Sequence, residues 1–553
     1  MRIDEARRLY AQIDRSKEAH VNDWRQISKY IAPTMGQFDE PRHSEDKTSI
    51  DYKSLINSTA VHALKVLGSG MMSGLTSPSV PWFKFKVVNS SGEDVAGSDI
   101  EKWADKLTSI IEDVFAKSNL YDVLPLFYNE LAAFGSAAFF VEEDFKTIIR
   151  CTFFTAGSYS VALDNNGRVN RFCRRFRKDV MGMAEAFGLE NCPESVKSEY
   201  ANKQFSTEHD ISHIIVPNVN YDPNKRNNLE MRYASVYFCD DVILRESGYR
   251  NFPVVFTRWK TKTENDVFGT GIGHEVLGDV RTLQKMEQKK LIAVDKLIDP
   301  PLQINGSEQG SINLYPGGVT RGMGMRIEPI YNVGLDLAAL QAAIEGIERR
   351  INEHFFVDVF QMIASRQDKT MTAYEVSALL GEKMMILGPI YHMIKTEGLD
   401  PLMSLVIEAG FELNFLPPPP DNAEVSAMDV EYISTIAMAQ KAEKLKILQQ
   451  GLNWGFSVAQ AQQTIMQTPV GDNIDMDGLV RSGMYALGLP ADTIRSKEDI
   501  QQIRAERAAQ QQAAAQAQAE EQNLATMKVL GGIKNKDGSN GLEKAQEMGA
   551  GRF

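Results

Sequence analysis

The sequence has few cysteines and no long hydrophobic run. Its four cysteines, Cys151, Cys173, Cys192 and Cys239, lie far apart, and no pair has C-x-x-C spacing. A structural zinc site is therefore not expected, and a reducing, cytosolic folding environment is the default. The most apolar stretch, residues 131–141, has about half of the roughly 20 residues that a membrane span needs. The N-terminus lacks a signal-peptide core, so we expect a soluble protein with no membrane partner.

Complete catalytic motifs are also lacking. FGTGIGH at 268–274 has G-x-G-x-G spacing and follows a polar run, which favours a flexible lead into a helix over a nucleotide site. The Walker motif G-x-x-x-x-G-K-[ST] does not occur, and His274-Glu275 lacks a second histidine at position 278. His209 and His213 are four residues apart in a segment typical of a strand, where a metal pair is the minor alternative. We therefore expect no enzyme, no cofactor and no metal.

An excess of positive charge is missing as well. The chain carries 60 Lys and Arg against 73 Asp and Glu, a net charge of −13. This balance argues against a tight, non-specific grip on a phosphate backbone, which needs clustered cations. It is compatible with a passage along which a polyanion slides without sticking, because like charges repel.

The first half of the chain contains helices and short β runs, which together predict an α+β lobe. Apolar residues at helical spacing predict helices over 4–31, 51–75, 98–117 and 121–135. Alternation and β-branched residues predict strands after Pro81 and within 137–144, 148–154, 158–163, 168–178, 213–219, 231–239 and 252–259.

The second half is mainly helical. Residues 274–298 and 337–359 predict two long helices around a turn-rich insert, which together make a hairpin with a small head. The second helix has an apolar seam of coiled-coil-like spacing, made by Leu340, Ile344, Ile347, Ile351 and Phe355. Thr372 and Glu375 fit a capping box, and Pro389 and Pro401 should kink the helix that follows. Compact helices are expected over 427–490, and an Ala/Gln-rich helix begins near residue 497.

Three glycines, Gly68, Gly70 and Gly74, lie in the helix that precedes the strand PWFKFKV. Each costs a helix interior up to about 1 kcal/mol relative to alanine. Glycines usually persist in such places where two backbones approach closely. We expect these three to serve tight packing and not chemistry.

Several segments in order resemble the portal (head-to-tail connecting) proteins of short-tailed bacteriophages. They are LGSGMMSGLTSPSVPWFKFKV at 67–87, NLYDVLPLFYNELAAFGSAAFFVEED at 119–144, FGTGIGHEVLGDVRTLQKMEQ at 268–288, INLYPGGV at 312–319, IEPI at 327–330 and MTAYEVSALLGEKMMILGPIYHMIKTEGLDPLMSLVIEAG at 371–410. The chain departs from the family pattern at Tyr374, inside the "TA-EV" word, and at Ala378, where a basic residue is expected. Because Ala378 is uncharged, no charge role is expected at that position.

The resemblance implies a ring of identical subunits, usually twelve, at one capsid vertex, with double-stranded DNA passing through its centre. It implies an α+β, mainly helical subunit whose parts follow one another in a fixed order along the chain. The expected parts are a wing at 1–265, stem helices at 266–298 and 336–363, a clip at 299–335, a channel loop at 364–371, a kinked wing helix at 372–416, a crown at 417–490, a barrel helix at 491–529 and a flexible tail at 530–553. Arg366, Gln367 and Lys369 fall in the channel loop and become candidates for transient contacts with DNA.

The implied partners are other copies of the chain, a terminase or packaging motor at the clip, tail adaptor proteins, and capsid and scaffold proteins. The implied location is the virion, after assembly in the host cytoplasm. One alternative is another virion assembly protein, such as a scaffold or adaptor, although a scaffold should be shorter and poorer in β runs. The other is a metal- or nucleotide-dependent nucleic-acid enzyme, which would require a motif that this sequence lacks.

Overall fold

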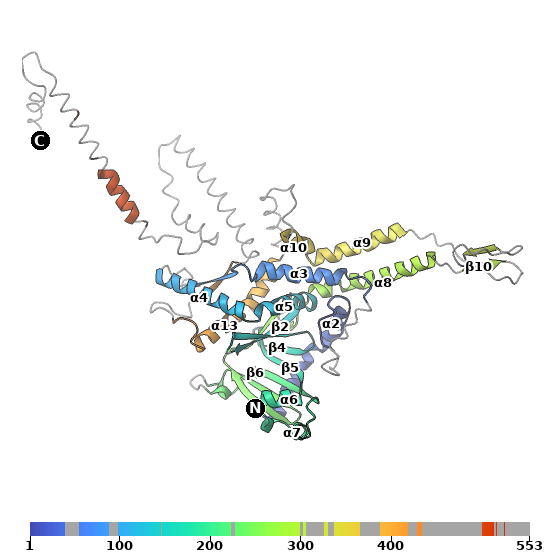
Figure 1. The fold of residues 1–553 in the computed structure, drawn as a ribbon, viewed down its shortest axis with the longest axis horizontal. Helices are drawn as coiled ribbons and strands as arrows, with labels where there is room; N and C mark the ends of the chain where they lie inside the picture. Colours follow the sequence, from blue (N-terminus) through green and yellow to red (C-terminus); the bar gives the residue numbers. More distant parts are fainter. Residues whose placement is uncertain are drawn as a thin grey trace, which may run out of the picture. The chain divides into compact units, whose positions relative to one another are not determined.

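The computed structural model describes residues 1–38, 55–87, 98–144, 146–222, 227–298, 302–305, 326–329, 337–364, 387–418 and 428–433, together with 500, 502–513, 516 and 525. The chain divides into two compact units, Met1–Val95 with Trp103–Ser457, and Ala96–Lys102 with Val458–Phe553. In the second unit, residues 502–513 are helical; they fall within the barrel helix predicted over 491–529. The first unit combines helices with antiparallel sheets (Figure 1), which confirms the predicted α+β, mainly helical class.

The N-terminal segment forms two helices, where the sequence predicts one. Helix α1 (Ile3–Asp14) is followed by a turn of 3-10 helix, η1 (Arg15–Lys17), and then by α2 (Glu18–Tyr30). Ala6 and Ile13 of α1 are buried in a cluster with strand residues such as Cys173. Trp24 in α2 is buried elsewhere, against Phe268. The tighter 3-10 turn lies between these two contacts.

The helices of the predicted wing lie close to their expected positions. They are α3 (Thr59–Leu75), α4 (Ser98–Lys117) and α5 (Leu120–Phe134), and the strand β1 (Phe83–Val87) follows Pro81. Helix α3 begins at Thr59 and not at the predicted residue 51, and residues 55–58 are not helical. The Asn57 side chain accepts a hydrogen bond from the Thr59 N–H at 2.9 Å at this start. Gly135 ends α5 in the left-handed conformation, with φ of 84°.

Two antiparallel sheets form the β part of this unit. One has the order β3-β2-β9, and the other has the order β4-β5-β6-β7-β8. Their strands are β2 (Ser136–Asp144), β3 (Ile148–Phe154), β4 (Tyr159–Leu163), β5 (Val169–Asp179), β6 (Glu208–Pro217), β7 (Tyr233–Cys239), β8 (Val242–Tyr249) and β9 (Val254–Arg258). Phe140 of β2 and Phe172 of β5 are buried, and each contacts Phe154. Aromatic contacts therefore join the two sheets.

Strand β8 and two short helices, α6 (Val180–Phe187) and α7 (Glu194–Ala201), are not among the predicted elements. Strand β8 is an edge strand in which only Leu244 is fully buried. An edge strand with one buried side chain shows little of the hydrophobic alternation on which the prediction depends. Asp179 begins α6 by accepting a hydrogen bond from the Gly182 N–H at 3.0 Å.

The predicted second rod is broken. Helix α8 (Ile272–Ile298) is continuous, and β10 (Leu302–Asn305) pairs with β11 (Arg326–Pro329). The chain then forms α9 (Leu337–His354) and, separately, α10 (Val357–Ala364), so the prediction of one helix over 337–359 is wrong. Phe356 has φ of 55°, a left-handed conformation that an α-helix does not contain.

The predicted wing helix at 372–416 contains a π-helical segment in its described part. Its described parts are α12 (Gly388–Met393), η6 (Ile394–Leu399, π-helical) and α13 (Asp400–Glu412). Pro389 lies in the first turn of α12, where its missing N–H costs least. Pro401 lies within continuous helical backbone, because Leu399 and Asp400 both have right-handed helical dihedrals. The π-helical turn η6 ends two residues before Pro401. A proline removes one N–H from the helical ladder, so a change of helix type beside it agrees with the irregular helix expected there.

A buried ion pair connects this helix to the sheet. Arg258, at the end of β9, and Glu397 in η6 form an ion pair, and their side chains are only 9% and 20% exposed. The Arg258 guanidinium also donates to the Asp266 carbonyl at 2.9 Å and to the Gly167 carbonyl at 3.2 Å. These bonds satisfy the buried charge, as burial of an ion requires.

Residues 428–432 form a strand where the sequence predicts compact helices. Strand β12 (Met428–Tyr432) pairs antiparallel with β1, from Phe83↔Tyr432 to Val87↔Met428. Tyr432 stacks on Trp82 and donates to Asp400 at 2.7 Å. The pairing partner lies about 340 residues earlier in the sequence, so no local pattern could have shown it. The remainder of 434–490 lies outside the described residues.

A buried carboxyl group organises the turn between β3 and β4. Glu130 of α5 is fully buried and accepts hydrogen bonds from the Ala156 N–H and from the Thr155 hydroxyl, the latter at 3.1 Å. Burial raises the pKa of Glu130 from 4.5 to about 8, although the two hydrogen bonds oppose this shift.

We predict that Glu130→Gln changes the pH dependence of stability. The folded state holds the proton more tightly than the unfolded chain, so this carboxyl group makes the wild-type free energy of unfolding fall as pH rises from about 5 to about 8. The difference from the variant should change by up to about 1.4 kcal/mol per pH unit in that window. Urea unfolding across the window measures it. The exposed control Glu185→Gln should follow the wild type, and parallel profiles for Glu130→Gln would contradict the prediction.

Candidate functional site

The feature most characteristic of this chain is the helical hairpin of α8 and α9, which run side by side (Figure 1). Nearest the sheets, the hairpin has a continuous apolar interior. Val276, Val280 and Leu283 of α8 are buried, as are Ile344, Ile347 and Ile351 of α9 and the following Phe355. Leu340, the first residue of the predicted seam, is half-buried. The seam residues are therefore in or next to the packed face of the hairpin.

Polar contacts fix the register of the two helices. The Gln284 side chain of α8 accepts from the backbone N–H groups of Ile56 and Asn57 at 2.9 and 3.0 Å and donates to the Asn57 carbonyl at 2.6 Å. Asn57 in turn donates to Glu348 of α9 at 2.7 Å. Because Gln284 is buried, a slip of one helix would leave its amide unsatisfied. Residues 56–57 thus hold α8 and α9 in one alignment.

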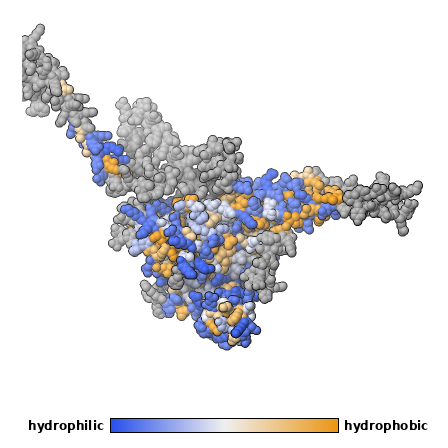
Figure 2. All heavy atoms as spheres, in the orientation of Figure 1, coloured by the Kyte–Doolittle hydropathy of each residue, from blue (hydrophilic) through white to orange (hydrophobic). Residues whose placement is uncertain are grey.

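The outer end of the hairpin has apolar side chains on its surface. Leu291, Ile292, Leu297 and Ile298 of α8 are 52%, 46%, 46% and 77% exposed, and Leu337 of α9 is 37% exposed. We call these five residues the exposed apolar end. Figure 2 shows hydrophobic surface gathered there. A grouped apolar surface of this kind is typical of protein association.

Beyond α8, the chain forms the β10–β11 pair, with register Leu302↔Pro329 to Asn305↔Arg326. It occupies part of the predicted clip at 299–335. The predicted channel-loop residues Arg366, Gln367 and Lys369 lie outside the described residues. Helix α10 reaches Ala364, the first residue of the loop as predicted.

The predicted packing glycines lie on α3, which contacts α5, α9 and α10. A Cβ atom on Gly68 would lie 2.1 Å from Asn129 Oδ1, and one on Gly70 would lie 2.1 Å from Phe360 Cδ1. Gly74 is buried. Thus Gly68 lies against α5 and Gly70 against α10.

The FGTGIGH segment has a structural role that differs from the flexible lead that the sequence suggests. A Cβ atom on Gly271 would lie 2.5 Å from the Ala132 carbonyl oxygen, and one on Gly273 would lie 2.1 Å from the Ala133 carbonyl oxygen. The segment is bonded in place, with the Thr270 N–H donating to the Lys260 carbonyl at 2.8 Å. These glycines allow the start of α8 to approach the end of α5 closely.

The two histidines of the minor metal alternative have other partners. His209 contacts Glu199 at 2.6 Å, while His213 contacts the Ser235 hydroxyl at 3.0 Å and stacks on Tyr237. Burial lowers the pKa of His213, and the positive charges of Arg174 and Arg245 lower it further. Among the described residues, no group of three or more His, Cys, Asp or Glu side chains is placed to hold a metal ion. In the same part of the chain, no helix combines the length and apolarity that a membrane crossing needs.

Comparison with known proteins defines the class first: residues 3–494 match the family model described as "Bacteriophage head to tail connecting protein". The chain belongs to this family of virion proteins, as the resemblance of its motifs predicts. It is 34% identical over 534 residues to the "Probable portal protein" of Bordetella phage BPP-1, covering 95% of this chain and 94% of the relative. It is 33% identical over 517 residues to the "Portal protein" of Salmonella phage epsilon15, covering 91% of each.

A solved structure titled "Virion of native gene transfer agent (GTA) particle" matches with 9% identity and a TM-score of 0.35, covering 81% of this chain and 94% of that one. Similarity at this level carries no argument about the fold. The family assignment rests on the sequence matches.

We predict opposite effects for two glycine-to-alanine changes. Gly70→Ala should lower the free energy of unfolding by about 1–3 kcal/mol, because the new methyl group overlaps Phe360. Gly278→Ala, in α8, should raise it by about 0.5–1 kcal/mol, because nothing lies within 4 Å of its Cβ position. Urea midpoints at unchanged m-value measure both effects.

The cause can be tested with a double-mutant cycle. Combining Gly70→Ala with Phe360→Leu should show a coupling energy, because the two side chains compete for one space. Shifts of the same sign for the two alanine variants, or additive effects in the cycle, would contradict the packing interpretation.

Proposed function

We propose that the chain is the portal subunit, which forms a ring-shaped channel at one capsid vertex. A packaging motor would drive double-stranded DNA through this channel, and the ring would then hold the genome and attach the tail. Family membership supports this role, as do two relatives named as portal proteins that each match more than 90% of the chain. The exposed apolar end of the hairpin is the single structural observation that carries the proposal.

The ring follows from the distribution of apolar residues along the hairpin. Nearest the sheets, the apolar seam is covered within the chain, whereas Leu291, Leu297 and Ile298 are exposed. Burial of each such side chain at an interface would contribute about 1.5–3 kcal/mol. Contacts with the hairpins of two neighbours, head to tail, would cover them and close a ring. We propose about twelve subunits, as the family resemblance implies.

The partners follow from the same arrangement. The clip at 299–335 would meet the packaging motor and tail adaptor proteins, and the wing would meet capsid and scaffold proteins. Assembly would take place in the host cytoplasm. The net charge of −13 would keep DNA mobile in the channel, because many phosphate contacts would act as a brake.

Ring formation provides the first test. Native mass spectrometry and negative-stain images of the purified protein should show a closed ring with a central hole. Leu291→Glu/Ile298→Glu should raise the protein concentration needed for rings at least about tenfold, because charges replace buried apolar contacts. The control Met181→Glu/Val219→Glu changes side chains that are 58% and 96% exposed outside the hairpin and should leave rings intact.

Two outcomes would contradict the proposal. Rings of unchanged stability in the Leu291→Glu/Ile298→Glu variant would exclude this surface from the interface. A wild-type protein that stays monomeric at high concentration and with scaffold protein present would exclude the ring itself, and would favour a different assembly role.

The channel loop provides the second test. Arg366→Ala/Lys369→Ala should form normal rings but lower the amount of DNA retained per particle, because two cations whose transient phosphate contacts resist backward sliding are lost. The control Lys106→Ala/Lys203→Ala removes two exposed cations of the wing and should package normally. Full packaging by the loop variant would assign Arg366 and Lys369 to an ordinary solvated loop.

A further inference from the structure

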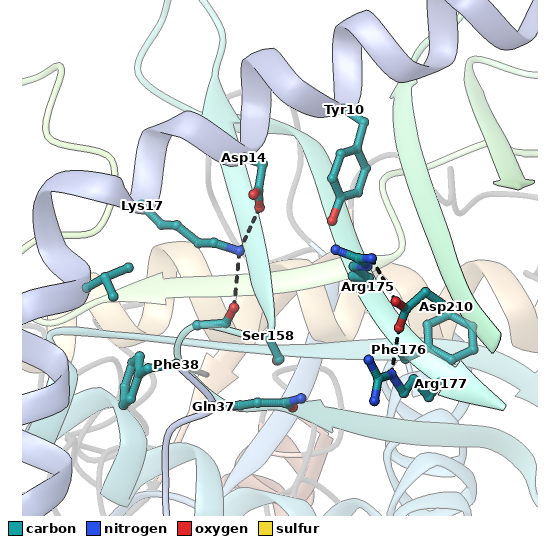
Figure 3. A pocket seen from close by; sticks show the side chains of 12 residues that line it. Tyr10, Asp14, Lys17, Gln37, Phe38, Ser158, Arg175, Phe176, Arg177 and Asp210 are labelled. Carbon is teal, nitrogen blue, oxygen red and sulfur yellow. Dashed lines mark hydrogen bonds and ion pairs between the residues drawn. The ribbon is translucent and has the colours of Figure 1, made fainter. Parts of the chain in front are cut away.

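A basic cleft borders strand β5 of the five-stranded sheet; the N-terminal helices line its smaller cavity, and residues of β3, β5, α6, β7 and β8 line its larger one. The two adjoining cavities have volumes of about 190 and 530 Å³ and share Gln37, Ser158, Arg175 and Phe176. Figure 3 shows the smaller one. Its cationic lining residues are Lys17, Arg174, Arg175, Arg177, Lys178 and Arg245, and its carboxylates are Asp14 and Asp210. This concentration of positive charge contrasts with the net charge of −13 of the whole chain.

Asp14 and Asp210 neutralise only part of this charge. Asp210 bonds Arg175 at 2.7 Å and Arg177 at 2.8 Å, and Lys17 bonds Asp14 at 2.6 Å (Figure 3). Lys178 and Arg245, in contrast, have no ion-pair partner in the described part of the chain. Arg174 and Arg245 contribute to the lowered pKa of the buried His213, after burial itself. The lining of the larger cavity therefore holds four cations and no carboxylate.

Aromatic rings form the walls of the larger cavity. They belong to Phe153, Phe154, Phe176, Phe187 and Tyr237. The Arg174 guanidinium lies 4.9 Å from the centre of the Phe154 ring and 4.7 Å from that of Phe176, and its Nε donates to His213 Nδ1 at 3.3 Å. These contacts hold the cation in place without a carboxylate. The cavity thus combines fixed positive charge with an apolar surface.

A strand edge borders the cleft. Strand β4 pairs with β5 only as far as Tyr159↔Arg174, whereas β6 accompanies β5 to Asp179↔Glu208. The chain before Tyr159 turns away, because the Gln37 N–H and Glu130 bind the turn that contains Ala156. In the described residues, no strand therefore pairs with 175–179 on the β4 side. The shared lining residues Ser158, Arg175 and Phe176 lie at this position.

We propose that the basic cleft binds an extended acidic segment of a partner protein, which adds a strand beside residues 175–179. Backbone N–H and C=O groups of the segment would pair with the β5 edge, as in other cases of strand addition. Its carboxylates would meet Arg174 and Lys178 in the 530 Å³ cavity, and the apolar side chains between them would face the 190 Å³ cavity on the other side of β5, whose lining includes Tyr10.

A nucleic acid fits these observations less well. A sugar-phosphate backbone cannot pair with a strand edge, and Asp14 and Asp210 in the lining would repel phosphates. The proposal concerns a different surface from the hairpin and does not depend on the ring.

The test measures binding to the full-length protein by fluorescence anisotropy. The probe is a labelled peptide that alternates glutamate with valine and phenylalanine. Lys178→Glu should weaken binding at least about tenfold, because this cation lies beside the proposed strand and faces its carboxylates. The matched control Lys203→Glu makes the same change in charge at an exposed position outside the cleft and should bind like the wild type.

Three further measurements test the mode of binding. A peptide of equal charge with prolines at alternate positions should bind at least about tenfold more weakly, because proline removes the N–H groups that a ladder needs. Bound probe should also slow amide hydrogen exchange within residues 175–179. Equal binding of the proline peptide, or no binding of the acidic peptide, would overturn the proposal. Displacement of the peptide by single-stranded oligothymidylate of higher affinity would assign the cleft to nucleic acid instead.

Discussion

The position of the hairpin depends on one close crossing of two backbones. At the end of α5, Gly135 has φ of 84°, and a Cβ atom there would lie 2.6 Å from the Gly271 nitrogen. The Trp259 N–H donates to the Gly135 carbonyl at 2.8 Å, and the Trp24 indole donates to the Phe134 carbonyl at 3.2 Å. Helices α2, α5 and α8 and strands β2 and β9 thus meet at one point. A side chain on Gly135 or Gly271 would separate α5 from α8.

The contacts around this crossing form a rigid base for the hairpin. The start of α8 is fixed by the glycine contacts, and Gln284 is bonded to residues 56–57, which precede α3. Arg258 fixes η6 to β9 directly beside the crossing. Only beyond Gln284 does α8 expose apolar residues, such as Leu291 and Ile298. The chain therefore supplies a rigid base and leaves a further apolar surface for contacts outside the subunit.

Sequence patterns predicted those elements whose signal lies within a single segment. Helix α4 matches its predicted bounds, and Gly135 ends α5 as expected, because apolar periodicity and a terminal glycine are properties of single segments. The pairing of β1 with β12, the edge strand β8 and the break at Phe356 depend on distant contacts or on weak local signals. The same limit applies to the sites. The order of the motifs identified the family, but no sequence motif indicates that Arg174, Lys178 and Arg245 line one cavity, because they come together only when the strands pair.

Charge would have opposite roles in the proposed DNA channel and in the basic cleft. A channel for DNA should carry few fixed cations, because each phosphate contact adds a barrier to movement. A docking site for an acidic segment needs fixed cations with a dry, apolar wall beside them. Arg174 meets this second condition because rings and His213 hold it. Its place on β5, among five antiparallel strands, is set by the sheet and not by the hairpin, so a chain with a net charge of −13 can keep one strongly basic site.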